Sequence, residues 1–210
     1  MKKRLPNRSV EFFDTQFQRQ SAQGEYALNP FEAAVLPLLA GRVLDFGCGI
    51  GNLAVAAAQN GCEVTALDAS PAAIEDLRKR ATKLALRVKA SVADLRAYEI
   101  PEGYDSIVSI GLLMFFPRPL AELGLQRIRD AVPPGGLAAV NVLIDGTTFM
   151  DMFDPPDYHL FHESELQAAF SGWTVEYLKL ESFPAPGNTG KRVCTIAARR
   201  PHRPFSRTKQ

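Results

Sequence analysis

Three carboxylates follow three successive apolar stretches of the chain. Asp45 comes two residues before a glycine-rich turn, Asp68 follows the second stretch, and Asp94 follows the third. Apolar runs that alternate with amphipathic stretches predict parallel strands, and the carboxyl ends of parallel strands meet at one edge of a sheet. We therefore expect the three acids to border one ligand-binding crevice.

The glycine-rich turn, GCGIG at 47–51, limits which ligand that crevice can hold. The turn is followed by Asn52, whereas a dinucleotide-binding GxGxxG turn would have glycine or alanine there. A pyrophosphate beside Asp45 would also face a like charge in a partly desolvated site. S-adenosylmethionine (SAM) has no phosphate and carries a cationic ammonium and a cationic sulfonium. The sequence therefore favours SAM, and it disfavours the alternative of an NAD(P)-dependent reductase.

The other two acids suit the rest of SAM. Asp68 can accept hydrogen bonds from both ribose hydroxyls. Asp94 can accept one from the exocyclic amine of adenine, with Leu95 against the ring. Each acid also has an ordinary structural interpretation, because Asp68 could cap the following helix and Asp94 could be a surface turn residue. Three acids at three successive strand ends make a shared ligand the better explanation.

The elements that must position these acids follow from apolar periodicity. We expect strands at 42–46, 62–67, 87–92, 105–110 and 137–144, separated by helices at 31–39, 52–60, 71–84 and 119–132. A short helix at 163–170 and two last strands at 174–180 and 193–198 follow a long loop. This alternation predicts an α/β fold with a doubly wound, mostly parallel sheet covered by helices on both faces. We divide the chain into an N-terminal helical cap or lid at 1–30, a SAM-binding domain at 31–198, and a basic, disordered tail at 199–210.

Composition and charge exclude several classes of protein. The 210 residues, 46% of them hydrophobic, can bury a substantial core, but no apolar run approaches the ~20 residues that span a bilayer. Basic residues cluster at both ends of the chain and leave an acidic body, which argues against a nucleic-acid partner. Three cysteines without a CxxC pair predict a reduced, cytoplasmic protein with no metal site. We expect a small-molecule substrate and no membrane partner, and the oligomeric state stays open.

Several stretches resemble the class I SAM-dependent methyltransferases, and within them the tellurite-resistance methyltransferases and their small-molecule relatives. These stretches are GEYALNPF (24–31), LDFGCGIGN (44–52), LLMFFPRP (112–119), PPGG (133–136) and FHESELQAAFSGW (161–173). The resemblance implies a seven-stranded sheet whose last strand, 193–198, runs antiparallel. It also implies cofactor contacts from the ends of the first four strands. The expected contacts are Asp45, Gly47, Cys48, Gly49, Gly51, Asn52, Asp68, Ala69, Asp94, Leu95, Ser109 and Ile110.

Candidate catalytic residues are few. The tellurite enzymes are thought to use histidine and arginine in the segment before the last strand. This chain has Lys191 and Arg192 there but no histidine between His162 and His202, so it departs from that pattern. We name Arg192 and His162 as the candidates, although His162 could simply face solvent near the start of a helix.

The acceptor site is expected to be partly aromatic. Phe13 and Phe17 recur at helical spacing in an otherwise polar opening, so their helix either packs on the body or closes over the site as a lid. Met114 would supply the opposite wall, and Arg192 would contact the substrate. Because soft or anionic acceptors need little help from a general base, we expect in-line methyl transfer to a thiol, a metalloid oxyanion or a similar small molecule. The alternatives are a SAM-binding protein without catalysis and a small-molecule O-methyltransferase.

Overall fold

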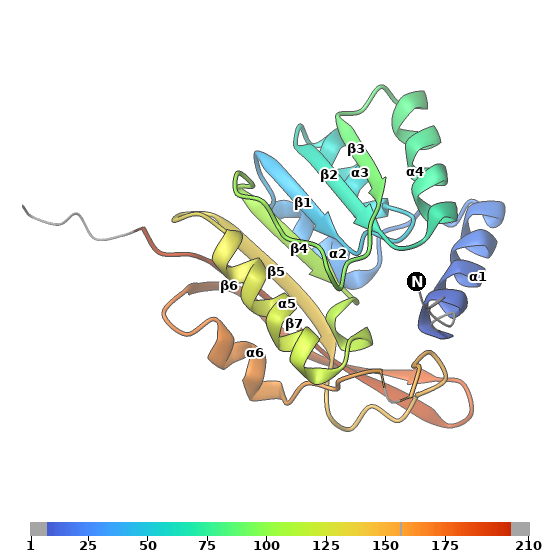
Figure 1. The fold of residues 1–210 in the computed structure, drawn as a ribbon, viewed down its shortest axis with the longest axis vertical. Coiled ribbons are helices and arrows are strands. Elements are labelled where there is room, and N and C mark those ends of the chain that lie inside the picture. Colours follow the sequence, from blue (N-terminus) through green and yellow to red (C-terminus); the bar gives the residue numbers. More distant parts are fainter. Residues whose placement is uncertain (1–7, 156, 203–210) are drawn as a thin grey trace, which may run out of the picture.

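The structure, a computed structural model, describes residues 8–155 and 157–202. One seven-stranded sheet forms its centre, in the order β3-β2-β1-β4-β5-β7-β6 (Figure 1). The strands are β1 (Arg42–Phe46), β2 (Glu63–Asp68), β3 (Val88–Val92), β4 (Ser106–Ile110), β5 (Leu137–Leu143), β6 (Thr174–Ala185) and β7 (Thr189–Arg199). The first five strands pair in parallel, and β7 is antiparallel to both of its neighbours. The predicted α/β fold, with a mostly parallel sheet and an antiparallel last strand, is confirmed.

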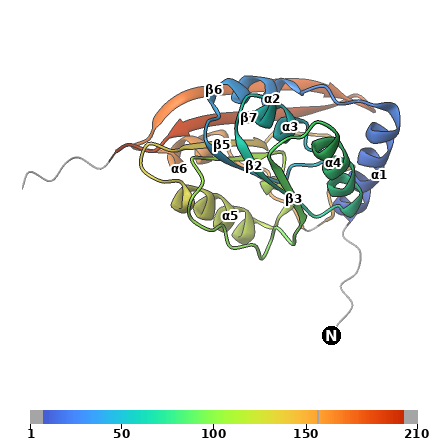
Figure 2. The same cartoon turned by 90° about the horizontal axis from the view of Figure 1, so that it is seen from above.

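Helices cover both faces of the sheet. The helices α2 (Pro30–Val35), α3 (Asn52–Gln59) and α4 (Pro71–Lys83) pack on one face, and α5 (Arg118–Ala131) and α6 (Glu163–Ala169) pack on the other (Figure 2). Two buried apolar clusters result, one on each face, because successive strand side chains point in opposite directions. Among the described residues, no helix is both long and apolar enough to cross a bilayer.

Local sequence signals set the ends of the helices. Asn29 caps α2 by accepting hydrogen bonds from the amides of Phe31 and Glu32, and the Glu32 carboxylate accepts one from the amide of Asn29 in return. The single helix expected at 31–39 is instead α2 followed by the 3₁₀ turn Leu36–Leu38. Pro37 explains the break, because proline lacks the amide hydrogen that would continue the α-helical hydrogen bonds.

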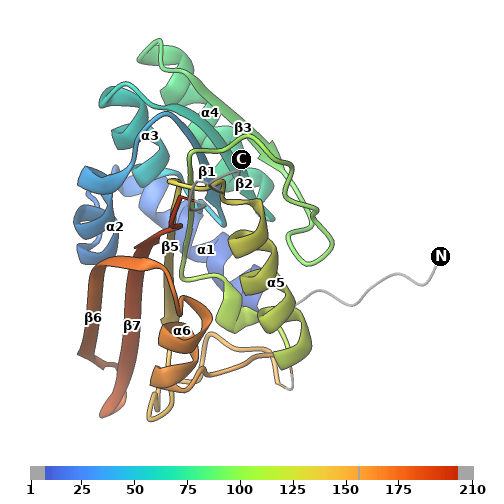
Figure 3. The ribbon, with the colours of Figure 1, turned by 90° about the vertical axis from the view of Figure 1, so that its left-hand side faces the viewer.

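The last two strands are longer than predicted. They form a hairpin that continues to Ala185 on β6 and begins again at Thr189 on β7 (Figure 3). Its tight turn has Gly187 and Asn188 in the left-handed conformation, a geometry that these two residue types tolerate best. Pro184 weakened the strand signal in the sequence, but β6 is an edge strand and can accept a proline.

The folded body extends beyond residue 198, where the start of the tail was expected. Arg199 belongs to β7 and pairs with Glu176 on β6 at 2.6 Å. The Arg200 guanidinium donates to the carbonyl oxygen of Val132 at 2.7 Å, at the end of α5. The start of the expected tail is therefore attached to the body, and residues 203–210 lie outside the described residues.

Helix α1 (Arg8–Gln23) stands beside the carboxyl ends of the parallel strands, next to α4 (Figure 1). Its apolar edge faces the body, with Phe12 and Phe13 packed against the cluster that also holds α5 and α6. Residues 1–7 of the predicted cap lie outside the described residues.

Candidate functional site

A cavity of about 1230 Å³ opens at the carboxyl edge of the sheet, beneath α1. Residues that follow β1, β2, β3 and β4 line it, together with residues of β5, β7, α1 and α2. Pockets for a single drug-sized ligand usually measure about 300–1,000 Å³. This cavity therefore has room for a cofactor and a second, smaller molecule.

The glycine-rich turn between β1 and α3 forms one wall. The amides of Gly47 and Cys48 both donate to the carbonyl oxygen of Leu67, which fixes the turn against the end of β2. Gly49 and Gly51 have φ values of 52° and 74°, in the left-handed region that favours glycine. A Cβ on Gly49 would also lie 3.0 Å from the Phe17 ring. The turn can therefore approach α1 closely because residue 49 has no side chain.

Asp68 points from the end of β2 into this cavity. Its Oδ2 accepts a 2.8 Å hydrogen bond from the amide of Gly49, and its Oδ1 accepts a 2.9 Å bond from the amide of Ser70. Burial raises the pKa of this carboxyl above its usual value, although the hydrogen bonds from Ser70, Gly49 and Ala69 oppose that shift. The carboxylate is thus held in one orientation by backbone donors, and each oxygen has capacity to accept a further bond from a ligand hydroxyl.

Asp45 lies below the turn and does not line the cavity. Its side chain is only 4% exposed, and its Oδ2 is buried with no hydrogen-bond partner among the described residues. Burial, and then the nearby carboxylates of Glu32 and Asp68, raise the pKa of Asp45 well above its ordinary value. The site therefore contains a concentration of negative charge that a cation nearby would relieve and a phosphate would worsen.

The third acid follows β3 as predicted. Asp94 is exposed at the mouth of the cavity, and its Oδ1 accepts a 3.1 Å bond from the amide of Arg96. Leu95 is buried and faces the same space. The pair offers a polar edge beside an apolar surface, which is the combination that a purine base requires.

Helix α1 covers the cavity with aromatic side chains. The ring of Phe13 lies 4.9 Å from the ring of Phe115, between centroids, and 5.8 Å from that of Phe17. Asp14, on the same helix, accepts a 2.5 Å hydrogen bond from the hydroxyl of Ser70 at the start of α4. The helix is therefore fixed at both sides of the cavity.

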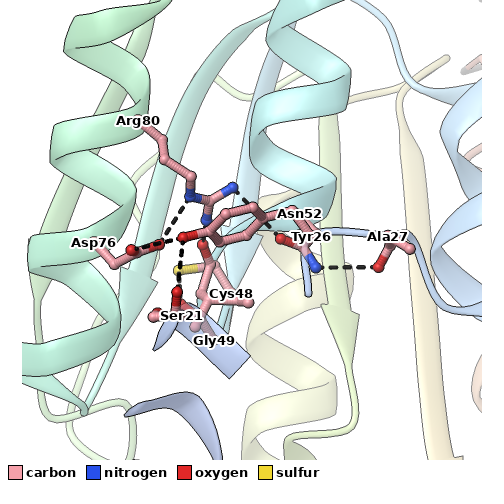
Figure 4. A network of polar contacts seen from close by, with 9 residues as sticks. Ser21, Tyr26, Ala27, Cys48, Gly49, Asn52, Asp76 and Arg80 are labelled. Carbon is pink, nitrogen blue, oxygen red and sulfur yellow. Dashed lines mark hydrogen bonds and ion pairs between the residues drawn. The ribbon is translucent and has the colours of Figure 1, made fainter. Parts of the chain in front are cut away.

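A second connection ties the segment after α1 to the glycine-rich turn (Figure 4). The Arg80 guanidinium lies 4.2 Å from the centre of the Tyr26 ring, and the Tyr26 hydroxyl donates to Asp76 at 3.1 Å. Arg80 also donates to Asn52, whose amide nitrogen donates to the carbonyl oxygen of Ala27. This contact could not be predicted from the sequence, because it joins residues far apart in the chain.

The far end of the cavity is mainly apolar. Phe149, Met152 and Val193 line it with the polar residues Asn141 and Lys191. Nζ of Lys191 lies 4.8 Å from the centre of the Phe149 ring. Burial lowers the pKa of the Lys191 ammonium from its ordinary value.

The structure corrects the expectation for Arg192. Side chains of β7 alternate between the two faces of the sheet, so Lys191 and Val193 reach the cavity and Arg192 does not. The Arg192 guanidinium donates instead to the carbonyl oxygen of Asp145 at 2.8 Å and pairs with Glu163 at 3.5 Å. Of these two adjacent basic residues of β7, Lys191 is therefore the one that lines the cavity.

His162 does not line the cavity either. Its exposed ring caps α6, accepting a hydrogen bond from the amide of Ser164, while Glu165 accepts one from the amide of His162. The Glu165 that follows three residues after position 162 is the sequence signal for this capping box. His162 therefore has a structural role at the start of α6 and does not reach the cavity.

The other predicted contacts divide into two groups. Those that line the cavity are Gly47, Cys48, Gly49, Asn52, Asp68, Ala69, Asp94, Leu95, Ile110, Phe13, Phe17 and Met114. Asp45, Gly51 and Ser109 support the walls from behind. Within the described part of the chain, no group of three or more His, Cys, Asp or Glu side chains could hold a metal ion.

Comparison with known proteins agrees with this geometry. Residues 43–136 match a family model described as a methyltransferase domain. The chain is 34% identical over 125 residues to a ubiquinone biosynthesis O-methyltransferase of Xanthomonas campestris, covering 56% of this chain and 51% of that protein. It is 29% identical over 138 residues to a probable SAM-dependent methyltransferase TehB of Haemophilus influenzae, covering 65% of this chain and 47% of that protein. The chain thus spans about half the length of these relatives.

Solved structures share the fold over most of the chain. The crystal structure of TehB from Haemophilus influenzae superposes with a TM-score of 0.72 and 22% identity, covering 91% of this chain and 67% of that one. A protein solved in a study of thioacetal formation during echinomycin biosynthesis gives a TM-score of 0.64 and 25% identity, covering 86% and 84%. The chain therefore resembles the class I SAM-dependent methyltransferases, in fold over most of its length and in sequence over residues 43–136.

Proposed function

We propose that the protein binds SAM along the ends of β1, β2 and β3 and transfers its methyl group to a small soft or anionic acceptor. The observation that carries this proposal is the Asp68 carboxylate, held by the amides of Gly49 and Ser70 beside a glycine-rich turn. The ribose would lie against Asp68, adenine between Asp94 and Leu95, and the cationic end of SAM near the glycine-rich turn above Asp45. Such a cation would offset the unpartnered negative charge there.

Methyl transfer from SAM depends mainly on the alignment of the acceptor with the methyl group and needs few catalytic groups. A methyl sulfonium is already activated, and holding the acceptor in line with it can contribute about 7–11 kcal/mol through positioning alone. The described residues that line the cavity include no histidine or tyrosine, which suits an acceptor that arrives with a free lone pair. The relatives named as an O-methyltransferase and as TehB support a small-molecule acceptor.

We further propose that residues 1–30 act as a lid on the SAM-binding domain. Phe13 and Phe17 would exclude water from the reacting methyl group, and α1 would have to move for the cofactor to enter. The buried, free thiols of Cys48, Cys62 and Cys194 support a reducing, cytoplasmic setting.

Calorimetric titration with SAM and with NAD, followed by a SAM-consumption assay over thiols, phenols, selenite and tellurite, tests the proposal. We expect SAM and its product S-adenosylhomocysteine to bind and NAD not to bind. Binding of SAM with no turnover over the whole panel would favour the alternative of a SAM-binding protein without catalysis. Binding of NAD in place of SAM would refute the proposal.

A further inference from the structure

We infer that the acceptor is a ring-sized apolar molecule with an acidic hydroxyl or thiol, bound as its anion with Lys191 as the counterion. This inference rests on the proposed function and specifies its substrate class. It follows from the division of the cavity, from the nature of the acceptor walls, and from the surroundings of Lys191.

The strand order divides the cavity into two compartments. The residues suited to SAM follow β1, β2 and β3, which lie together on one side of the sheet. The remaining space lies over β4, β5 and β7. Because β7 runs antiparallel, its N-terminal half, with Lys191 and Val193, reaches the same edge as the C-terminal ends of β4 and β5. The acceptor must therefore occupy the compartment that includes Lys191.

Aromatic and aliphatic side chains form the walls of this acceptor compartment. Phe31 and Phe183 meet edge to face, with centroids 5.5 Å apart, and the Phe13 and Phe115 rings form a similar pair at 4.9 Å. Rings of this kind bind a flat apolar molecule well through offset and edge contacts. A compact oxyanion such as tellurite would lose its hydration and find few donors there.

Lys191 supplies a positive charge from β7 to this compartment. Its side chain is partly buried, its Nζ lies over the Phe149 ring, and it forms no ion pair with a described carboxylate. Among the described charged residues, Glu32 and Arg19 line the same cavity, as do Asp68, Asp94 and Arg96 on its cofactor side, and the pair Arg192–Glu163 lies outside it. Burial lowers the pKa of Lys191, and an anion bound beside the ammonium would oppose that shift.

The reaction balances without a protein base. The acceptor leaves its proton in the solvent and enters as a phenolate or thiolate paired with the Lys191 ammonium. A lone pair on its oxygen or sulfur forms the bond to the methyl carbon of SAM. The bond from that carbon to the sulfonium breaks, and its electron pair stays on sulfur. The products are a neutral ether or thioether and neutral S-adenosylhomocysteine, and Lys191 keeps its charge.

The first test measures the ionisation of a bound probe. The protein loaded with S-adenosylhomocysteine is titrated with 4-nitrophenol over a range of pH, and the visible absorbance of the phenolate reports the ionised fraction. We expect bound 4-nitrophenol to ionise at lower pH in the wild type than in Lys191→Met, by about 1–3 pH units, because the ammonium stabilises the anion. Lys191→Arg should retain the wild-type midpoint, and Lys179→Met, on the exposed edge strand, is the matched control.

The second test separates this inference from the proposed function. We expect kcat/KM for thiophenol to exceed that for tellurite by about tenfold or more, and Lys191→Met to remove most of that advantage while SAM affinity is unchanged. Equal ionisation midpoints in the wild type and Lys191→Met would overturn the inference. So would efficient methylation of tellurite without methylation of thiophenol, although methyl transfer itself would then stand. Failure to bind SAM would overturn the proposed function and this inference with it.

Discussion

The carboxylate of Asp14 accepts a 2.5 Å hydrogen bond from the hydroxyl of Ser70, and this bond connects the helix over the cavity to the end of β2. The same Ser70 hydroxyl accepts a bond from the amide of Ala73 and so caps α4. The Ser70 hydroxyl thus links the lid to the start of a core helix, and the backbone amide of the same residue donates to Asp68 on the cofactor wall. The contact of Ser70 with the lid can be tested separately from its capping of α4, because Asp14 takes part only in the contact with the lid.

Asp14→Ala should loosen α1 and leave the core intact. Loss of one hydrogen bond to a charged group costs about 1.5–3 kcal/mol locally, so amide hydrogen exchange in residues 8–23 should accelerate by roughly tenfold or more. The midpoint of global unfolding should change little, because α4 keeps its cap. Gln18→Ala is the matched control, since it removes the 2.8 Å bond to Asp14 within α1 and leaves the bond to Ser70. Equal exchange rates in the two variants would show that Asp14 does not hold the lid.

Asp68→Ala should weaken SAM binding by at least about tenfold, equivalent to about 1.4 kcal/mol. The reason is the loss of an acceptor that the amides of Gly49 and Ser70 hold in place for the ribose hydroxyls. Titration calorimetry measures the affinity, and circular dichroism confirms that the variant is folded. Asp130→Ala, at an exposed position on α5, should leave the affinity unchanged. Undiminished SAM affinity in Asp68→Ala would remove the ribose assignment.

Much of the cofactor side of the site could be predicted from the sequence. Asp68 and Asp94 each follow an apolar run, and parallel strands bring the residues after such runs to one edge whatever the details of packing. Asp45 was expected in the crevice but supports it from behind, because it lies within β1 and its side chain turns into the protein beneath the glycine-rich turn. The apolar pattern locates the end of a strand to within a residue or two. It does not determine in which direction a single side chain at that end points.

The acceptor side could not be predicted in the same way. Whether Lys191 or Arg192 reaches the cavity depends on the register between β5 and β7, and a shift of one residue exchanges the two. The sequence places two basic residues side by side and contains no information on that register. The contact between Tyr26 and Arg80 was missed for a related reason, since only the folded chain brings α4 beside the segment after α1.

Asp45 makes stability depend on pH in a direction opposite to that of a salt-bridged acid. Folding raises the pKa of this carboxyl, so the folded protein holds the proton more tightly than the unfolded chain does. Its contribution to the free energy of unfolding is therefore present below the unfolded-state pKa and is lost as pH rises through the folded-state pKa. Asp45→Asn should raise the Tm of the ligand-free protein at neutral pH by about 2–4 °C per kcal/mol regained.

The same substitution should flatten the dependence of Tm on pH and weaken the binding of SAM, because the cation loses a nearby negative charge. Differential scanning calorimetry from pH 5 to pH 8, with and without SAM, measures both effects. Asp130→Asn, which removes an exposed carboxylate, should follow the wild-type curve. A slope in Asp45→Asn as steep as that of the wild type would mean that another group titrates.

Gly51 joins the glycine-rich turn to α3, and its replacement should be costly for two separable reasons. Its φ of 74° strains any other residue, and an added Cβ would lie 2.5 Å from Leu77 Cδ2, in a side chain that is fully buried. Gly172 has a similar φ of 80° but nothing within 4 Å of an added Cβ, so Gly172→Ala carries the backbone strain alone. Gly51→Ala should therefore lower the free energy of unfolding by about 1–3 kcal/mol more than Gly172→Ala does, measured by urea denaturation.

A double-mutant cycle identifies the source of that difference. Leu77→Ala costs stability by leaving a cavity, but in the Gly51→Ala background it also relieves the clash, so the two substitutions together should cost less than the sum of the single effects. Additive effects would mean that α3 and α4 move apart to admit the methyl group. In that case the glycine-rich turn would shift with α3, and Gly51→Ala would lose SAM affinity even where its stability loss is small.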